Sequence, residues 1–152
     1  MTTKALFSAV VAGALVLGCA IEPVRTRTHA SCQKQDCEIK VTVVDGRVGV
    51  DIDELEIRGN RDVHILWHLP PGYEFIASMG DGVFFKIDDR GQFEEPYVTD
   101  DEKGQPVANK RSGKNFHWRD KNTAPGPYEY KILFHDRSGK AYAKDPTIMN
   151  AA

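Results

Sequence analysis

The sequence predicts an all-β fold, a single Greek-key β-sandwich over residues 37–152. Apolar and polar residues alternate with a period of two in many short runs, which is the pattern of half-buried strands. Glycine, proline, asparagine and aspartate separate these runs at close spacing, as in sandwiches and barrels. Beyond the first twenty residues, no segment has the periodicity of a helix of any length.

The first expected strands follow one another through tight turns. Apolar residues take alternate positions over residues 39–43, and Asp45-Gly46 then gives a hairpin signal before a second alternating run at 48–52. A short strand is expected at 55–57. Residues 63–69 form the most regular alternation in the chain.

Further strands are expected at 73–75, 83–87, 115–119 and 128–134, each bounded by turn-forming residues. Residues 94–114 differ, because they form a long polar insertion whose charges change from acidic to basic, and we expect a solvated excursion there. Large aromatic side chains at alternating positions are expected in the core: Trp67, Phe85, Trp118, Tyr128 and Phe134.

The first twenty residues have the features of an export signal. Lys4 supplies a positive charge, residues 5–17 are almost wholly apolar, and small residues follow. The apolar run is shorter than the about 20 residues that a membrane-spanning helix needs. We therefore expect residues 1–18 to be a cleaved signal peptide.

The end of this signal, Val16-Leu17-Gly18-Cys19, resembles the lipobox of bacterial lipoproteins. The resemblance implies acylation of Cys19, a tether over residues 19–36 and anchoring to the membrane through the N-terminal lipid, whose acyl chains bury many methylenes. Ala20 implies the periplasmic face of the outer membrane in a Gram-negative cell. The alternative is an ordinary secretory signal cut near Ala20 or Ala30, which would discard Cys19 and give a periplasmic or secreted protein.

The charge and the cysteines of the chain bear on which partners and which cellular compartment we expect. The chain has 20 basic and 22 acidic residues and shows no basic patch suited to nucleic acid. Cys32 and Cys37 would meet an oxidising compartment, which predicts a disulfide between them. Its small loop implies a modest gain in stability. The alternative is a redox or metal pair, but the spacing is not C-x-x-C and no His or Cys partner is close in sequence.

The histidines offer candidates for a metal site. His64 and His68 share a strand face but lie about 13 Å apart, too far for one ion to bridge. His117 is offset in parity from Phe116 and Trp118. A Zn or Cu site would form if His117 met His64 or His68 across neighbouring strands. The alternative is that these imidazoles face solvent on a half-buried sheet.

Other chemistry is not indicated. Asp51–Glu54 and Asp88-Asp89 are acidic segments without the spacing of an EF-hand, and aspartate commonly stabilises turns. Ser78, Ser112 and Ser138 lie in no nucleophile motif. We expect no enzyme and no cofactor, and a small hydrolase is the least favoured function.

Gly126-Pro127-Tyr128-Glu129-Tyr130 resembles a signature near the end of cupredoxins and many immunoglobulin-like domains. There the first tyrosine packs at a sandwich corner and bonds to nearby backbone, so the resemblance implies a sandwich of one of these two types. A blue-copper centre needs a His₂Cys ligand set. Ile132 occupies the position where the resemblance would place the cysteine, which implies the scaffold without that metal centre.

A broader resemblance is to the small bacterial β-sandwich proteins grouped as the DP-EP family, which has no assigned function. The resemblance implies a fold and no chemistry. It rests on short pieces spread over most of the domain: Cys37-Glu38-Ile39, Ile65-Leu66-Trp67, Gly72-Tyr73-Glu74-Phe75, Phe85-Lys86, Gln92-Phe93, Glu95-Pro96, Trp118-Arg119-Asp120-Lys121-Asn122 and Asp145-Pro146-Thr147-Ile148-Met149-Asn150.

Together, these observations predict an exported, lipid-anchored envelope protein that acts as a non-enzymatic binding or structural module. Its expected partner, besides the membrane, is an envelope protein or glycan. The alternative is a periplasmic Cu- or Zn-binding protein that uses His64, His68 and His117.

Overall fold

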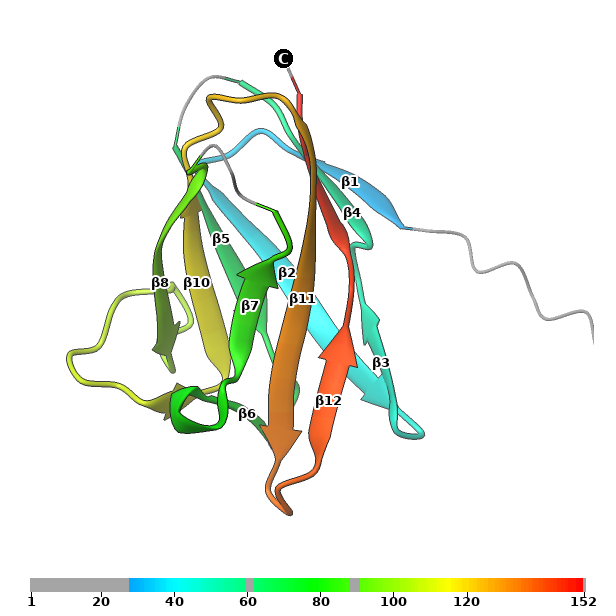
Figure 1. The fold of residues 1–152 in the computed structure, drawn as a ribbon, viewed down its shortest axis with the longest axis vertical. Helices are drawn as coiled ribbons and strands as arrows, with labels where there is room; N and C mark the ends of the chain where they lie inside the picture. Colours follow the sequence, from blue (N-terminus) through cyan, green and yellow to red (C-terminus); the bar gives the residue numbers. More distant parts are fainter. Residues whose placement is uncertain (1–27, 60–61, 88–90, 152) are drawn as a thin grey trace, which may run out of the picture.

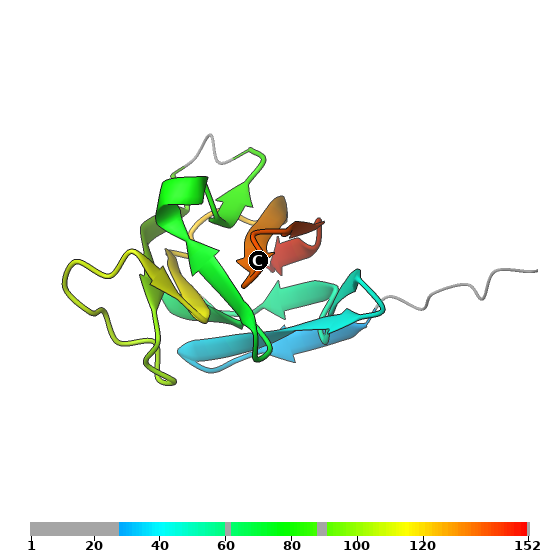
Figure 2. The same cartoon turned by 90° about the horizontal axis from the view of Figure 1, so that it is seen from below.

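A computed structural model describes residues 28–59, 62–87 and 91–151, whose strands form two facing sheets (Figures 1 and 2). The chain crosses repeatedly between the sheets, and the predicted all-β sandwich is confirmed. The expected signal peptide (residues 1–18), the expected lipid site Cys19, and Asp88-Asp89 lie outside the described residues. Within the described residues, no helix is both long enough and apolar enough to cross a membrane.

One sheet has five strands in the order β3-β2-β5-β10-β8. Strands β2 and β5 run parallel, whereas the other neighbours are antiparallel. Apolar residues alternate along the central strands, so that one face meets the core and the other points outward. The strands are β2 (Asp36–Val44), β3 (Arg47–Val50), β5 (Val63–His68), β8 (Phe93–Thr99) and β10 (Asn115–Asp120).

The other sheet has eight strands, with β1-β4-β13-β11-β6-β9 as its main path and β7 and β12 also paired to β11. Strand β1 lies within the segment expected to be a tether and adds a parallel edge strand beside β4. A short 3-10 helix, η1 (Ala77–Met79), follows β6. The strands are β1 (His29–Cys32), β4 (Glu54–Ile57), β6 (Tyr73–Ile76), β7 (Gly82–Phe85), β9 (Ser112–Gly113), β11 (Gly126–Asp136), β12 (Ala141–Lys144) and β13 (Thr147–Asn150).

The core lies between the sheets and is built around aromatic side chains. Trp67 from β5 meets Tyr130 from β11 edge to face, with ring centroids 5.4 Å apart, a favourable arrangement for aromatic pairs. The expected core aromatics are buried or packed against the core. The Tyr128 hydroxyl donates to the Ala124 carbonyl at 3.0 Å, which is the corner contact that the resemblance implied.

Residues 94–114 are only partly the solvated excursion that we expected. Residues 105–109 are exposed, but 94–99 belong to β8 and Gly104 is buried beside Leu66 of β5. Hydrogen bonds explain the difference. The Tyr97 hydroxyl donates to the Gly104 carbonyl at 2.6 Å, and the Thr99 hydroxyl donates to the Gln105 carbonyl at 2.7 Å. Figure 1 shows the segment leaving β8 and returning through β9 to β10.

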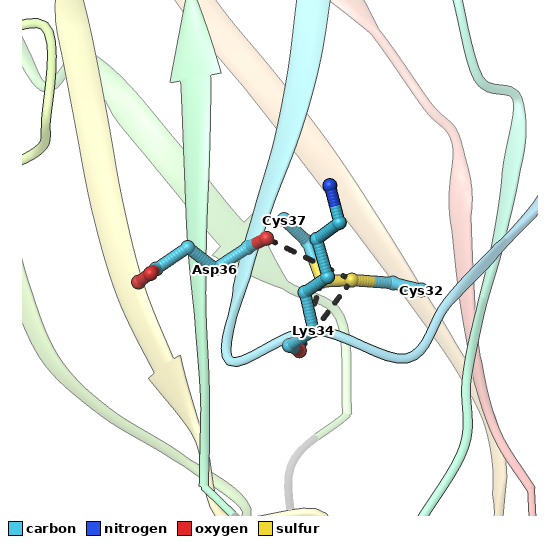
Figure 3. Close-up of a disulfide and its surroundings, with 4 residues drawn as sticks. All are labelled: Cys32, Lys34, Asp36 and Cys37. Atoms are coloured by element: carbon cyan, nitrogen blue, oxygen red, sulfur yellow. Dashed lines mark hydrogen bonds between the residues drawn. A yellow bond between two sulfur atoms is a disulfide. The ribbon is translucent and has the colours of Figure 1, made fainter.

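The predicted disulfide between Cys32 and Cys37 is present, with the two Cα atoms 6.2 Å apart. Figure 3 shows the bond together with Lys34 and Asp36 of the connecting segment. Cys32 ends β1 in one sheet and Cys37 lies in β2 of the other. The bond therefore joins the two sheets covalently at one edge.

We expect the free energy of unfolding of the double variant Cys32→Ser/Cys37→Ser to be about 2 kcal/mol lower than that of the wild type. The loss is modest because a disulfide that closes a short loop removes little conformational freedom from the unfolded chain. Urea unfolding followed by tryptophan fluorescence would measure this loss. Wild-type protein reduced with dithiothreitol is the matched control and should show the same loss. Equal midpoints in all three samples would contradict the expectation.

The hairpin between β11 and β12 leads to a second prediction, which concerns how stability depends on pH in acid. Hydrogen bonds to Asp136, first from the Ser138 hydroxyl, hold the pKa of its carboxyl at about 2. A carboxyl with a lowered pKa stabilises the fold above its unfolded pKa of about 4, and this contribution is lost as the pH falls towards 2. Asp136→Asn should therefore be less stable than wild type at pH 7, with a difference that shrinks between pH 4 and pH 2. Thermal melts across this range would show a constant difference if the hydrogen bonds contribute nothing.

Candidate functional site

The outer face of the five-stranded sheet gathers polar and titratable side chains. In β5, Ile65 and Trp67 point into the core, so His64, Leu66 and His68 point outward. In β10, Phe116 belongs to the core, so His117 lies on the outer face, as its parity predicted. His117 is paired with Leu66 across the two strands. His64 and His117 are therefore diagonal neighbours.

The structure brings His64 and His117 into contact, whereas His68 stays apart. His64 Nδ1 lies 2.9 Å from His117 Nε2, and the ring centroids are 5.1 Å apart. His68 Nδ1 instead lies 2.9 Å from Asn115 Oδ1. The interpretation of these imidazoles as solvent-facing is wrong for His117, which is only 3% exposed. Tyr97 of the edge strand β8 covers its ring.

Two contacts from β8 fix the ring of His117. The ring stacks on Tyr97 with centroids 4.3 Å apart and planes 17° apart. On its far side from His64, Nδ1 lies 3.3 Å from the Glu95 carbonyl oxygen. A carbonyl can only accept, so His117 carries its proton on Nδ1 and presents a lone pair at Nε2. His64 therefore donates from Nδ1 to His117.

An irregularity in β8 aims the Glu95 carbonyl at His117. The pairing of β8 with β10 shifts between His117 and Arg119, so β8 holds one residue more than β10 there, as in a β-bulge. Glu95 has a φ of 57°, in the left-handed region that residues other than glycine seldom adopt. Such a conformation costs about 1–3 kcal/mol and is concentrated at functional sites.

The electrostatic environment keeps His117 neutral. Burial lowers the pKa of its imidazole, and the nearby His64 also lowers it, although the Glu95 carbonyl acts in the opposite direction. A neutral ring agrees with the tautomer that the hydrogen bonds require. His117 thus offers a fixed nitrogen lone pair at neutral pH.

The pair lines a cleft of about 670 Å³ between the outer face of the sheet and residues 102–106. Its size is within the range of small-ligand pockets. The lining of the cleft contains more acidic than basic side chains. Its lysine is Lys103. The cleft therefore favours positively charged ligands. Its acidic residues are Asp36, Glu38, Glu95 and Glu102.

Sequence reasoning missed the residues of β8 that orient the histidines. Glu95 and Tyr97 act through the bulge and through the pairing of β8 with β10, and neither feature leaves a periodic pattern in the sequence. Pro96 was the one local signal, since proline in a sheet favours edge strands and bulges.

The other histidines lie in separate environments. His29 Nε2 is 3.8 Å from carboxylate oxygens of both Glu54 and Glu56 at the edge of the eight-stranded sheet. His135 Nδ1 lies 2.8 Å from the buried carboxylate of Asp81, which also accepts from the Ile76 amide at 2.9 Å. This pair of a half-buried histidine and a buried aspartate connects β11 to the turn after η1 and was not foreseen.

Within the parts of the chain that the structure describes, no three or more His, Cys, Asp and Glu side chains are grouped so as to hold a metal ion. Cys32 and Cys37 are bonded to each other. Among the described residues, the contact between His64 and His117 is therefore a two-residue arrangement.

No protein-family model matches the sequence. A search of curated proteins likewise gives no match.

Proposed function

We propose that this protein is a lipid-anchored binding module of the bacterial cell envelope that holds part of an envelope partner in the cleft beside His64 and His117. The observation that supports this most strongly is the cleft itself. It is formed by a sheet face and a hydrogen-bonded loop, and binding sites are commonly concave and already formed before the ligand arrives.

The loop over the cleft is held in place from several directions. Tyr97 and Thr99 donate to its carbonyls, and the Asn115 side chain donates to the Asp101 carbonyl at 2.9 Å. A Cβ atom on Gly104 would approach Leu66 Cδ1 to 3.1 Å, so the loop lies close to the sheet. A wall that is already ordered lowers the entropic cost of binding.

The charge of the cleft indicates the chemistry of the partner. Its carboxylates would attract a basic segment of an envelope protein more than a neutral glycan. Anchoring follows from the lipobox-like sequence ending at Cys19, which gives the proposed location on the periplasmic face of the outer membrane. The disulfide between Cys32 and Cys37 agrees with a protein that folds in an oxidising compartment.

A second candidate function is metal handling in the periplasm. One observation favours it, the contact between two imidazole nitrogens in an acidic cleft. Imidazole is a common ligand of zinc and copper. This candidate uses His64 and His117 but not His68.

Photo-crosslinking in living cells would test the binding module. A photoreactive amino acid at Glu38 or Lys103, both in the lining of the cleft, should give a crosslinked product of defined mass. The matched control is the same amino acid at Lys131, which is exposed on β11 of the other sheet and should give none. Products of equal yield at all three positions, or none at the cleft positions, would contradict the proposal. A product sensitive to glycosidase would identify a glycan instead of a protein.

The lipid anchor makes a separate prediction. Cys19→Ser should abolish labelling with radioactive palmitate and release the protein from membranes into the soluble fraction, because the acylated side chain is missing. The control is Ser31→Ala, which keeps the proposed lipid site and should label as the wild type does. Labelling that persists in Cys19→Ser would rule out this anchor.

A further inference from the structure

We propose that His64 Nδ1 and His117 Nε2 form a two-nitrogen chelate for a divalent transition-metal ion, with Cu(II) bound most tightly. This inference rests on the second candidate function and names its ligand atoms, its preferred ion and its coordination geometry. It does not depend on the basic partner segment proposed for the same cleft.

The distance between the two nitrogens selects the geometry. Metal–imidazole bonds are about 2.0–2.1 Å long. Two nitrogens 2.9 Å apart then subtend about 90° at the ion, which is the angle between neighbouring ligands in a square plane. A tetrahedral ion with bonds of this length would need the nitrogens about 3.3 Å apart. The spacing therefore suits Cu(II) better than Zn(II).

The surroundings of His117 are those of an oriented metal ligand. Metal-binding histidines usually donate their other ring N–H to a carboxylate, a backbone carbonyl or water, which fixes the tautomer. Here His117 Nδ1 donates to the Glu95 carbonyl, and the stacked Tyr97 ring limits rotation of the imidazole. The left-handed conformation of Glu95, in the bulge of β8, directs this carbonyl towards the ring.

Metal binding requires a change of tautomer at His64 and a rotation of the imidazoles, because the two nitrogens point at each other in the hydrogen bond and must both face the ion in the complex. The His64 proton moves from Nδ1 to Nε2 through water, so that both facing nitrogens present lone pairs and no proton is lost overall. The hydrogen bond between the two rings is replaced by two bonds to the metal. The carboxylates that line the cleft offset the charge of the entering cation.

Coordination positions that no protein side chain fills are typical of a site that takes up and releases its ion. Structural metal sites in proteins are usually closed by four protein ligands. This site has two protein nitrogens, and water or a partner's side chain would fill the remaining positions. Copper(II) heads the usual affinity order of divalent ions for such ligands, so it should bind here before Zn(II).

A titration with copper would test the proposal on the full chain, purified in detergent without a polyhistidine tag. We expect one equivalent of Cu(II) to bind, with an electron paramagnetic resonance spectrum of a tetragonal ion that has two nitrogen donors. His64→Gln and His117→Gln should each weaken binding about tenfold or more by calorimetry. His68→Gln is the matched control, because it removes an outward imidazole from the same strand as His64, and its affinity should stay at the wild-type value.

The outcomes separate this inference from the proposed binding module. A wild-type chain that binds no Cu(II) at micromolar concentration overturns the metal site, and so does binding that survives in both His64→Gln and His117→Gln. Zn(II) bound in preference to Cu(II) would overturn the geometric argument. If His117→Gln fails to fold, His64→Gln decides alone, because His64 is only half-buried. Crosslinking from Glu38 and Lys103 would still report on the envelope partner in every case.

Discussion

The alternation of side chains along β5 and β10 is the constraint on which the rest of this structure depends. Trp67 and Phe116 must point inward to build the core, and this places His64 and His117 on the opposite face. Because the two strands are direct neighbours, the outward histidines are held at contact distance by the same register that packs the core. The core and the candidate site therefore share one set of strand pairings.

The outer face of a sheet in a sandwich would normally be exposed to water. Here the edge strand β8 and the chain after it cover part of that face. The bulge in β8 turns Glu95 towards His117 and lets the following chain fold back over Leu66. Bulges at sheet edges often redirect a side chain or end the pairing. In this protein the bulge orients one imidazole, and the chain that follows it closes one side of the cleft.

Much of the fold could be predicted from the sequence, because period-two alternation and turn residues are local signals. The strand at 63–69, the corner contact of Tyr128 and the disulfide between Cys32 and Cys37 were all predicted and are confirmed. The choice of His64 over His68 as neighbour of His117 could not be predicted, since strand order and register are long-range properties. The packing of Gly104 against Leu66 was missed for the same reason, because a polar composition does not reveal where a loop finds hydrogen-bond partners.

The covalent link at the edge of the sandwich also has a mechanical consequence. Among the described strands, β1 pairs with β4 alone, so a pull on the chain before β1 would break the hydrogen bonds between these two strands one after another. The bond from Cys32 passes such a pull directly to β2, which lies beside β3 and β5 in the opposite layer. Tension arriving from the proposed membrane anchor would thus be shared by both layers of the sandwich.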